Sequence, residues 1–223
     1  MRIVWMVFAA SALLGSWPSG YAATPARSVV DNTVVSPRDP AVRITLTDSV
    51  HYVGTDRFVF TKPGLGAFDA AELFAFADAG KDGRIRKYIW VQFEGYLPGH
   101  PDLHFTYDSP KHVTIDGLDF YEDIGVTSPK PLKPGTDSAH FYSLLASHGY
   151  ERGDLMWVRL VHLPDPAKKR KELMIIYAES LAPTGYTAQQ LDEGGSDHAQ
   201  WAAMAAALSR RAIQSIRIRD DAE

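Results

Sequence analysis

One stretch of the sequence, KYIWVQFEGYLPGH at residues 87–100, places a carboxylate and an amide among bulky aromatic side chains. Side chains alternate between the two faces of a strand. One face therefore carries Ile89, Val91 and Phe93, and we expect it to belong to the core. The other face combines aromatic and polar groups, and its members are Tyr88, Trp90, Gln92, Glu94 and Tyr96. Such a face indicates either a sheet surface that meets water or the wall of a ligand pocket.

Two later strand-like segments, 154–163 and 171–181, repeat this mixture of aromatic and charged residues. If their polar faces lie on the same side of the sheet as Trp90, then Arg159 comes to lie between the carboxylates of Glu94 and Glu179. Convergent polar groups in an aromatic setting are typical of a small-molecule site. The predicted ligand-binding residues are Tyr88, Trp90, Gln92, Glu94, Tyr96, Trp157, Arg159, Tyr177 and Glu179.

The patterns that indicate catalysis are weaker. Glu94 and Glu179 would suit acid–base work on a sugar if their separation allowed it, and the sequence does not set that separation. His162 is close to Glu172 across the connection between the last two strands and could tune an acid–base pair. The sequence contains no nucleophile or metalloprotease motif. We therefore expect a non-catalytic protein, with a hydrolase that uses Glu94 and Glu179 as the alternative.

Histidines supply the candidate metal ligands, and His100, His104 and His112 lie in one proline-containing stretch. The spacing of four in HPDLH would direct two imidazoles at one metal on a helix, but Pro101 disfavours a helix here. The chain has no cysteine, which excludes disulfides, thiolate ligands and thiol nucleophiles. We expect no cofactor or metal and retain the three histidines as candidates.

The N-terminus predicts export. Arg2, an apolar run at 3–14 and small residues before position 23 form the pattern of a secretory signal peptide at 1–22. Its removal takes away one Arg and no acid, so the net charge changes from −4 to −5. A mildly acidic chain without a basic block disfavours nucleic acid and anionic membrane surfaces as partners. No later run is long and apolar enough to span a bilayer. We expect a soluble protein of the periplasm.

The pattern along the rest of the chain predicts one α+β domain. Residues 23–40 are polar and without period, which predicts a flexible segment; the domain is expected at 41–219 and a tail at 220–223. A hairpin is expected from 71–78 and 85–97, and a helix from about residue 137 to Gly149. A capping box at Thr187 and Gln190 opens a short helix, and Ser196 is expected to cap a long amphipathic one. The fold expected is a mainly antiparallel sheet packed on one side by helices, including this C-terminal helix.

These features together predict an exported protein that binds a small molecule or assists another envelope protein through the aromatic and polar face. Exposed Trp and Tyr also suit contacts between proteins. An envelope protein–protein interaction module that uses the same face is therefore a further alternative.

Overall fold

The computed structural model describes residues 26–220, which form two antiparallel sheets and three α-helices. The predicted signal peptide at 1–22 and most of the predicted tail lie outside the described residues. The larger sheet has seven strands in the order β4-β5-β6-β10-β9-β8-β7. Their bounds are His51–Lys62 (β4), Gly66–Ala79 (β5), Ile85–Tyr96 (β6), His112–Ile115 (β7), Leu118–Thr127 (β8), Leu155–His162 (β9) and Lys171–Ser180 (β10).

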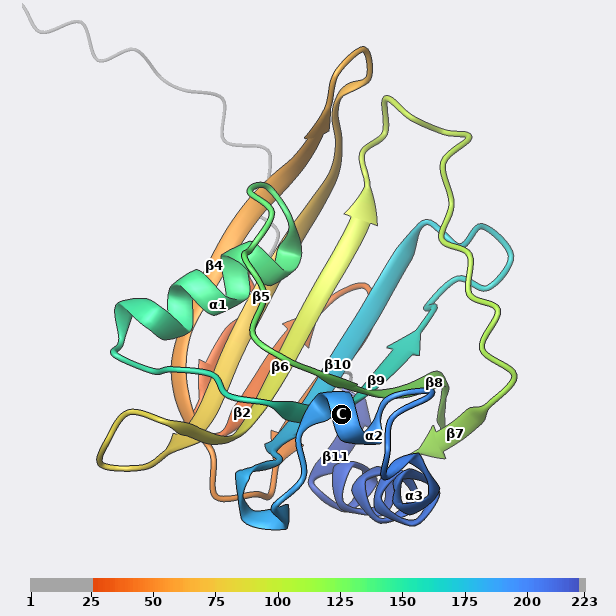
Figure 1. The fold of residues 1–223 in the computed structure, drawn as a ribbon. Helices are drawn as coiled ribbons and strands as arrows, with labels where there is room; N and C mark the ends of the chain where they lie inside the picture. The colour runs from red at the N-terminus through yellow and green to blue at the C-terminus, as the bar shows by residue number, and fades with distance from the viewer. Residues whose placement is uncertain (1–25, 221–223) are drawn as a thin grey trace, which may run out of the picture.

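The smaller sheet has four strands in the order β1-β2-β3-β11. Their bounds are Ser28–Val30 (β1), Thr33–Pro37 (β2), Ala41–Leu46 (β3) and Ile216–Asp220 (β11). The helices are α1 (Asp137–Ser147), α2 (Ala188–Leu191) and α3 (His198–Gln214), and a 3₁₀ turn covers Ala182–Thr184. Figure 1 shows α1 lying across β4 and β5, and α3 at the far end of the molecule beside β11.

Both faces of the seven-stranded sheet are largely buried. The back face carries Ile89, Val91 and Phe93, and it packs against the small sheet and against Leu208 and Ala212 of α3. The front face is covered by α1 and by the segment at 98–111, and its own core gathers the residues Tyr88, Trp90, Phe105, Phe141 and Leu145. The α+β class is thus confirmed, as is the core position of the apolar face of β6. Helices lie on both faces, because α1 crosses the front of the sheet.

The hairpin expected from residues 71–78 and 85–97 is confirmed as β5–β6, with Phe76 paired with Ile89. The turn needs glycine at position 83, where φ is +78° and a Cβ atom would lie 2.5 Å from the carbonyl oxygen of Gly149. The capping box of Thr187 and Gln190 is also confirmed. The helix α3 begins at His198 after Asp197, because Ser196 donates its hydroxyl to the Asp197 carboxylate and does not cap the helix.

The predicted flexible segment at 23–40 is wrong for residues 28–37, which form β1 and β2. Val34 is fully buried and pairs with Ile44 of β3. The predicted tail begins one residue too early, since β11 runs to Asp220 and buries Ile216 and Ile218. These strands have three to five residues each, so their alternation is too short to be recognised without the sheet that they join. Among residues 26–220, no helix is both long and apolar enough to cross a bilayer.

Candidate functional site

The front face of β6 carries the predicted polar and aromatic set, but α1 fills the space over its first half. Trp90 is 2% exposed, and its ring stacks on that of Phe141 with centroids 4.4 Å apart. The Tyr88 hydroxyl lies 2.9 Å from that of Tyr142. Tyr88 and Trp90 are therefore core residues, and the open aromatic wall expected at this end of the strand is occupied by the helix.

A chain of side-chain hydrogen bonds runs along the strand from Trp90 to Glu94. The indole Nε1 of Trp90 donates to Oε1 of Gln92 at 3.1 Å, and Nε2 of Gln92 donates to Oε2 of Glu94 at 2.7 Å. Gln92 is fully buried, and a buried amide needs such partners because desolvating it without them costs free energy. The polar groups of Trp90 and Gln92 are thus connected by hydrogen bonds to the carboxyl of Glu94.

Three carboxyl groups meet at this end of the sheet, and we call Asp69, Glu94 and Glu172 the carboxyl cluster. The register places Glu94 of β6 directly opposite Glu172 of β10. Asp69 of β5 pairs with Tyr96, one step further along the same face. Asp69 is 1% exposed and Glu172 is 3% exposed. Side chains opposed in this way have their Cβ atoms about 5 Å apart, so the cluster is compact.

Burial and mutual repulsion raise the pKa values of the three acids in the carboxyl cluster. Burial, and then the neighbouring charges of Glu172 and Asp69, raise the pKa of Glu94 to about 10. Burial also raises the pKa of Glu172 to about 7 and that of Asp69 above its ordinary value. A hydrogen bond links Glu94 and Asp69. Near neutral pH, Glu94 is therefore an uncharged hydrogen-bond donor, while Glu172 is close to its titration midpoint.

An aromatic segment covers the carboxyl cluster. The hydroxyl of Tyr107 donates to Oε2 of Glu172, and Phe105 stacks on Tyr96 at 4.5 Å. Arg170 holds this segment by donating to the carbonyl oxygens of His100, Leu103 and Leu97 at 2.6, 2.9 and 3.0 Å. Asp69 and Glu172 are thus covered by side chains whose backbone is fixed to the sheet, whereas Glu94 stays half-buried.

The accessible part of the front face lies on β9, beside this cover. Arg159 donates to Asp123 of β8 at 2.6 Å, and its guanidinium carbon lies 5.7 Å from the centre of the Tyr107 ring. The Arg159 side chain is 38% exposed. The half-buried indole of Trp157 lies on Gly125, where an added Cβ would be 2.6 Å from the ring. These two side chains have the exposure that a ligand-contacting surface needs.

Tyr177 and Glu179 were predicted on this face, and that placement is wrong. In β10 the residues opposite Trp90 and Glu94 are Ile176 and Glu172, so the odd-numbered positions point to the back. There Glu179 accepts two hydrogen bonds of 2.8 Å from Arg211 of α3 and one of 2.5 Å from Tyr177. Glu179 therefore anchors α3 to the sheet, and the predicted acid–base pair of Glu94 with Glu179 does not exist.

His162 is also directed away from Glu172, because it pairs with Leu173 on the back face. Its Nδ1 lies 2.9 Å from the backbone oxygen of Asp119, so the predicted acid–base pair of His162 with Glu172 does not form.

The three candidate metal ligands have separate partners. His100 contacts the Ala67 carbonyl at 2.8 Å, His104 the Asp102 carbonyl at 3.2 Å, and His112 the Asp119 carboxylate at 3.0 Å. Within residues 26–220, no group of three or more His, Asp or Glu side chains has the arrangement of a metal site.

The sequence interpretation missed Asp69, Glu172 as a neighbour of Glu94, Tyr107 and Asp123. Asp69 carried a signal, since it is an acid flanked by the apolar residues Ala67, Phe68, Ala70 and Ala71. Glu172 also carried a signal, because it is an acid on the same strand face as the apolar residues Met174 and Ile176. Alternation assigns residues to two faces within a strand but does not say which faces of two strands coincide.

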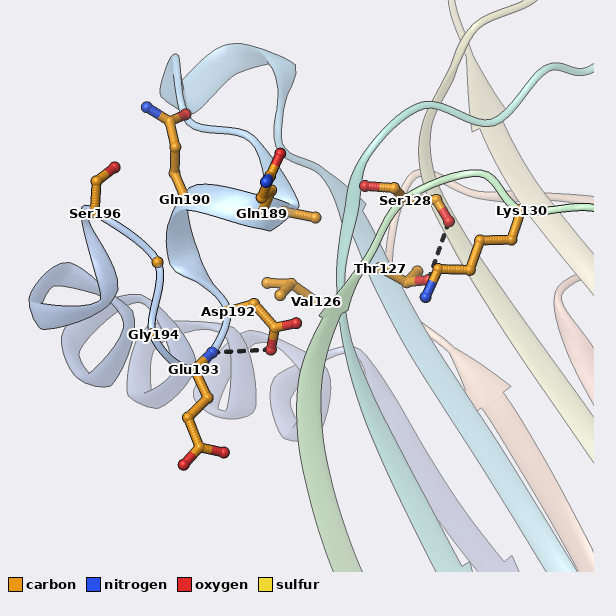
Figure 2. Close-up of a pocket in the computed structure, with 12 residues that line it drawn as sticks. Val126, Thr127, Ser128, Lys130, Gln189, Gln190, Asp192, Glu193, Gly194 and Ser196 are labelled. Atoms are coloured by element: carbon orange, nitrogen blue, oxygen red, sulfur yellow. Dashed lines mark hydrogen bonds between the residues drawn. The ribbon is translucent and has the colours of Figure 1, made fainter.

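A hollow of about 680 Å³ lies between the end of β8 and the connection from α2 to α3. Figure 2 shows Thr127, Ser128 and Lys130 on one side of it, and Asp192 and Glu193 on the other. The dashed bonds within it are local, such as that from the Glu193 amide to the Asp192 carboxylate at 3.0 Å. Its lining carries charges of both signs, so we assign no ligand to it.

Comparisons with protein-family models, with curated proteins and with solved structures gave no significant match to this chain. The geometry of the front face is therefore the basis for a functional proposal.

Proposed function

We propose that this chain is an exported, soluble binding protein without catalytic activity, and that its ligand is a small polar molecule. The ligand contacts Trp157 and Arg159 and reaches the carboxyl of Glu94. Export rests on the signal-peptide pattern at 1–22. The periplasm is the compartment that fits these features.

The observation that carries this proposal is the position of the carboxyl cluster beside half-exposed aromatic and guanidinium groups. Arg159 donates several hydrogen bonds, and the half-buried carboxyl of Glu94 offers an acceptor oxygen near it. An indole next to them offers an apolar surface. A ligand with hydroxyl or amide groups and one apolar side matches these three groups.

The test starts with protein purified from the periplasm of its host, whose mass is measured under native and denaturing conditions. We expect an excess native mass that is lost on denaturation. Arg159→Gln should lower ligand occupancy about tenfold, since a charge-assisted hydrogen bond contributes about 1.5–3 kcal/mol. The fold should persist, because Arg159 and Asp123 are both partly exposed.

The matched control is Arg86→Gln, which breaks an exposed ion pair with Asp78 away from the site. A bare native mass for the wild type would contradict the proposal. Equal occupancy in the Arg159 and Arg86 variants would also contradict it.

The alternative is a hydrolase, with Glu172 in the place that the sequence interpretation gave to Glu179. The pKa values of about 10 for Glu94 and about 7 for Glu172 favour it, because an acid–base pair needs one protonated carboxyl and one that ionises near neutral pH. Hydrolysis of nitrophenyl glycosides that Glu94→Gln abolishes in a folded protein would support this function. The absence of hydrolysis between pH 5 and 9 would count against it.

A further inference from the structure

A pocket with cationic walls lies where the small sheet meets β5 and β6, and its walls include Glu94 but neither Trp157 nor Arg159. Its main part measures about 330 Å³ and a smaller part about 140 Å³. The two parts share the wall residues Arg27, Arg38, Ala70 and Phe93. They therefore form one continuous depression, which we call the cationic pocket.

Positive charge exceeds negative charge in the cationic pocket. The described residues that line it include the cations Arg27, Arg38, Arg57 and Lys171 and the acids Asp39, Glu72 and Glu94. Glu94 holds its proton near neutral pH, because its pKa is raised to about 10. Without Arg38, the three cations Arg27, Arg57 and Lys171 thus face the two carboxylates of Asp39 and Glu72, and this excess of positive charge favours an anion.

Arg27 forms the fixed inner wall of the pocket. Its side chain is 9% exposed and lies over the Phe93 ring, with the guanidinium carbon 4.0 Å from the ring centre. It donates to the Ser36 hydroxyl at 2.9 Å, the Arg38 carbonyl at 3.0 Å and Glu72 at 3.2 Å. Burial lowers the pKa of Arg27, and the nearby charge of Arg38 lowers it further although Glu72 opposes this. A second anion at this position would therefore be stabilised.

Arg57 and Lys171 form the outer wall and can reach a ligand from solvent. The Arg57 side chain is 61% exposed and makes two hydrogen bonds, of 2.8 and 2.5 Å, to Glu72 Oε1. The Lys171 side chain is 48% exposed and pairs with Asp39 at 2.6 Å. Glu72 is thus shared by two guanidinium groups, which leaves charge on both for another acceptor.

We propose that the cationic pocket binds the oxyanion group, phosphate or carboxylate, of a small molecule or a lipid headgroup. Guanidinium groups present paired donors that match two oxygens of such a group. Arg57 is the cation that engages it from the outer wall. Apolar wall residues, among them the half-exposed Val59, accommodate a short apolar part next to the oxyanion.

Inorganic phosphate is the first probe. Thermal unfolding of the protein is measured with and without phosphate, and sodium chloride keeps the ionic strength constant. We expect the Tm to be higher in phosphate than in chloride at the same ionic strength, because a ligand that binds only the folded state stabilises it. Arg57→Gln should weaken phosphate binding about tenfold, and Lys171→Gln should weaken it to a smaller extent. The second variant serves if the first does not fold.

Arg86→Gln is a closely matched control. The Arg86 side chain is also 61% exposed and also pairs with a carboxylate at 2.5 Å, but it lies outside the pocket. It should retain the full phosphate response. Equal losses in the Arg57 and Arg86 variants would overturn the proposal, since the effect would then be one of general charge.

A second arm distinguishes the source of the oxyanion. Vesicles of phosphatidylglycerol, with phosphatidylcholine as control, are mixed with wild-type protein and with Arg57→Gln. Binding of wild type alone to the anionic vesicles supports a lipid headgroup, and a response to phosphate alone supports a free oxyanion. No response to either probe would overturn the proposal.

Discussion

Glu94 is the residue whose chemistry depends most on the tertiary structure. In the sequence it is one acid within an aromatic strand. In the fold it lies opposite Glu172, is linked to Asp69 and accepts a hydrogen bond from Gln92. Desolvation and neighbouring acids convert an ordinary carboxylate into a group that stays protonated near neutral pH.

This raised pKa predicts how stability depends on pH. Glu94 and Glu172 bind their protons more tightly when folded than at the reference pKa of 4.5. Their contribution is complete below pH 4.5 and is lost as the pH rises toward about 7 for Glu172 and about 10 for Glu94. The wild type should therefore be more stable at pH 5 than at pH 8.

Glu94→Gln should remove much of this dependence, because an amide cannot ionise and can still accept the bond from Gln92. When the pH is raised from 5 to 8, the wild type should lose about 2–4 kcal/mol more of its free energy of unfolding than the variant does. Urea unfolding at both pH values measures this. Glu193→Gln, an exposed acid, is the control. Parallel curves for wild type and Glu94→Gln would contradict the assigned pKa.

At the scale of elements, β11 shows how a short strand can matter for the whole core. Ile216 and Ile218 are 0% and 4% exposed, whereas Arg217 and Arg219 on the alternate face are exposed. Ile218 pairs with Ile44 of β3. A segment for which the sequence analysis predicted no strand is therefore a strand, because α3 ends at Gln214 and the chain returns to the small sheet.

Ile218→Ala should lower the free energy of unfolding by about 2–4 kcal/mol, since it removes a buried side chain and leaves a cavity. Arg219→Ala, one residue away on the exposed face, should change it by less than about 0.5 kcal/mol. Urea unfolding of the two variants gives the comparison. Similar small effects for both would mean that residues 216–220 contribute no core packing.

At the scale of the whole molecule, the seven-stranded sheet separates two cores, and each strand face must match one of them. The long strands β5, β6, β9 and β10 could be located from the sequence because their apolar runs are long and bounded by turn residues. The back face of β6 could be assigned to the core for the same reason. The candidate site was only partly predictable: Glu94, Trp157 and Arg159 share the front face as expected, whereas Tyr177 and Glu179 do not.

The sequence by itself determined the α+β class, the β5–β6 hairpin, the capping box and the alternation within each strand, because these depend on interactions between residues close along the chain. Only the tertiary structure decided that Glu172 and not Glu179 faces Glu94, that α1 covers Trp90, and that the segments at 28–37 and 216–220 join one sheet. Such pairings depend on the register between strands that are far apart in sequence, and a shift of one residue exchanges the two faces of a strand. The pKa values of the carboxyl cluster follow from that register, since they depend on which acids are buried together.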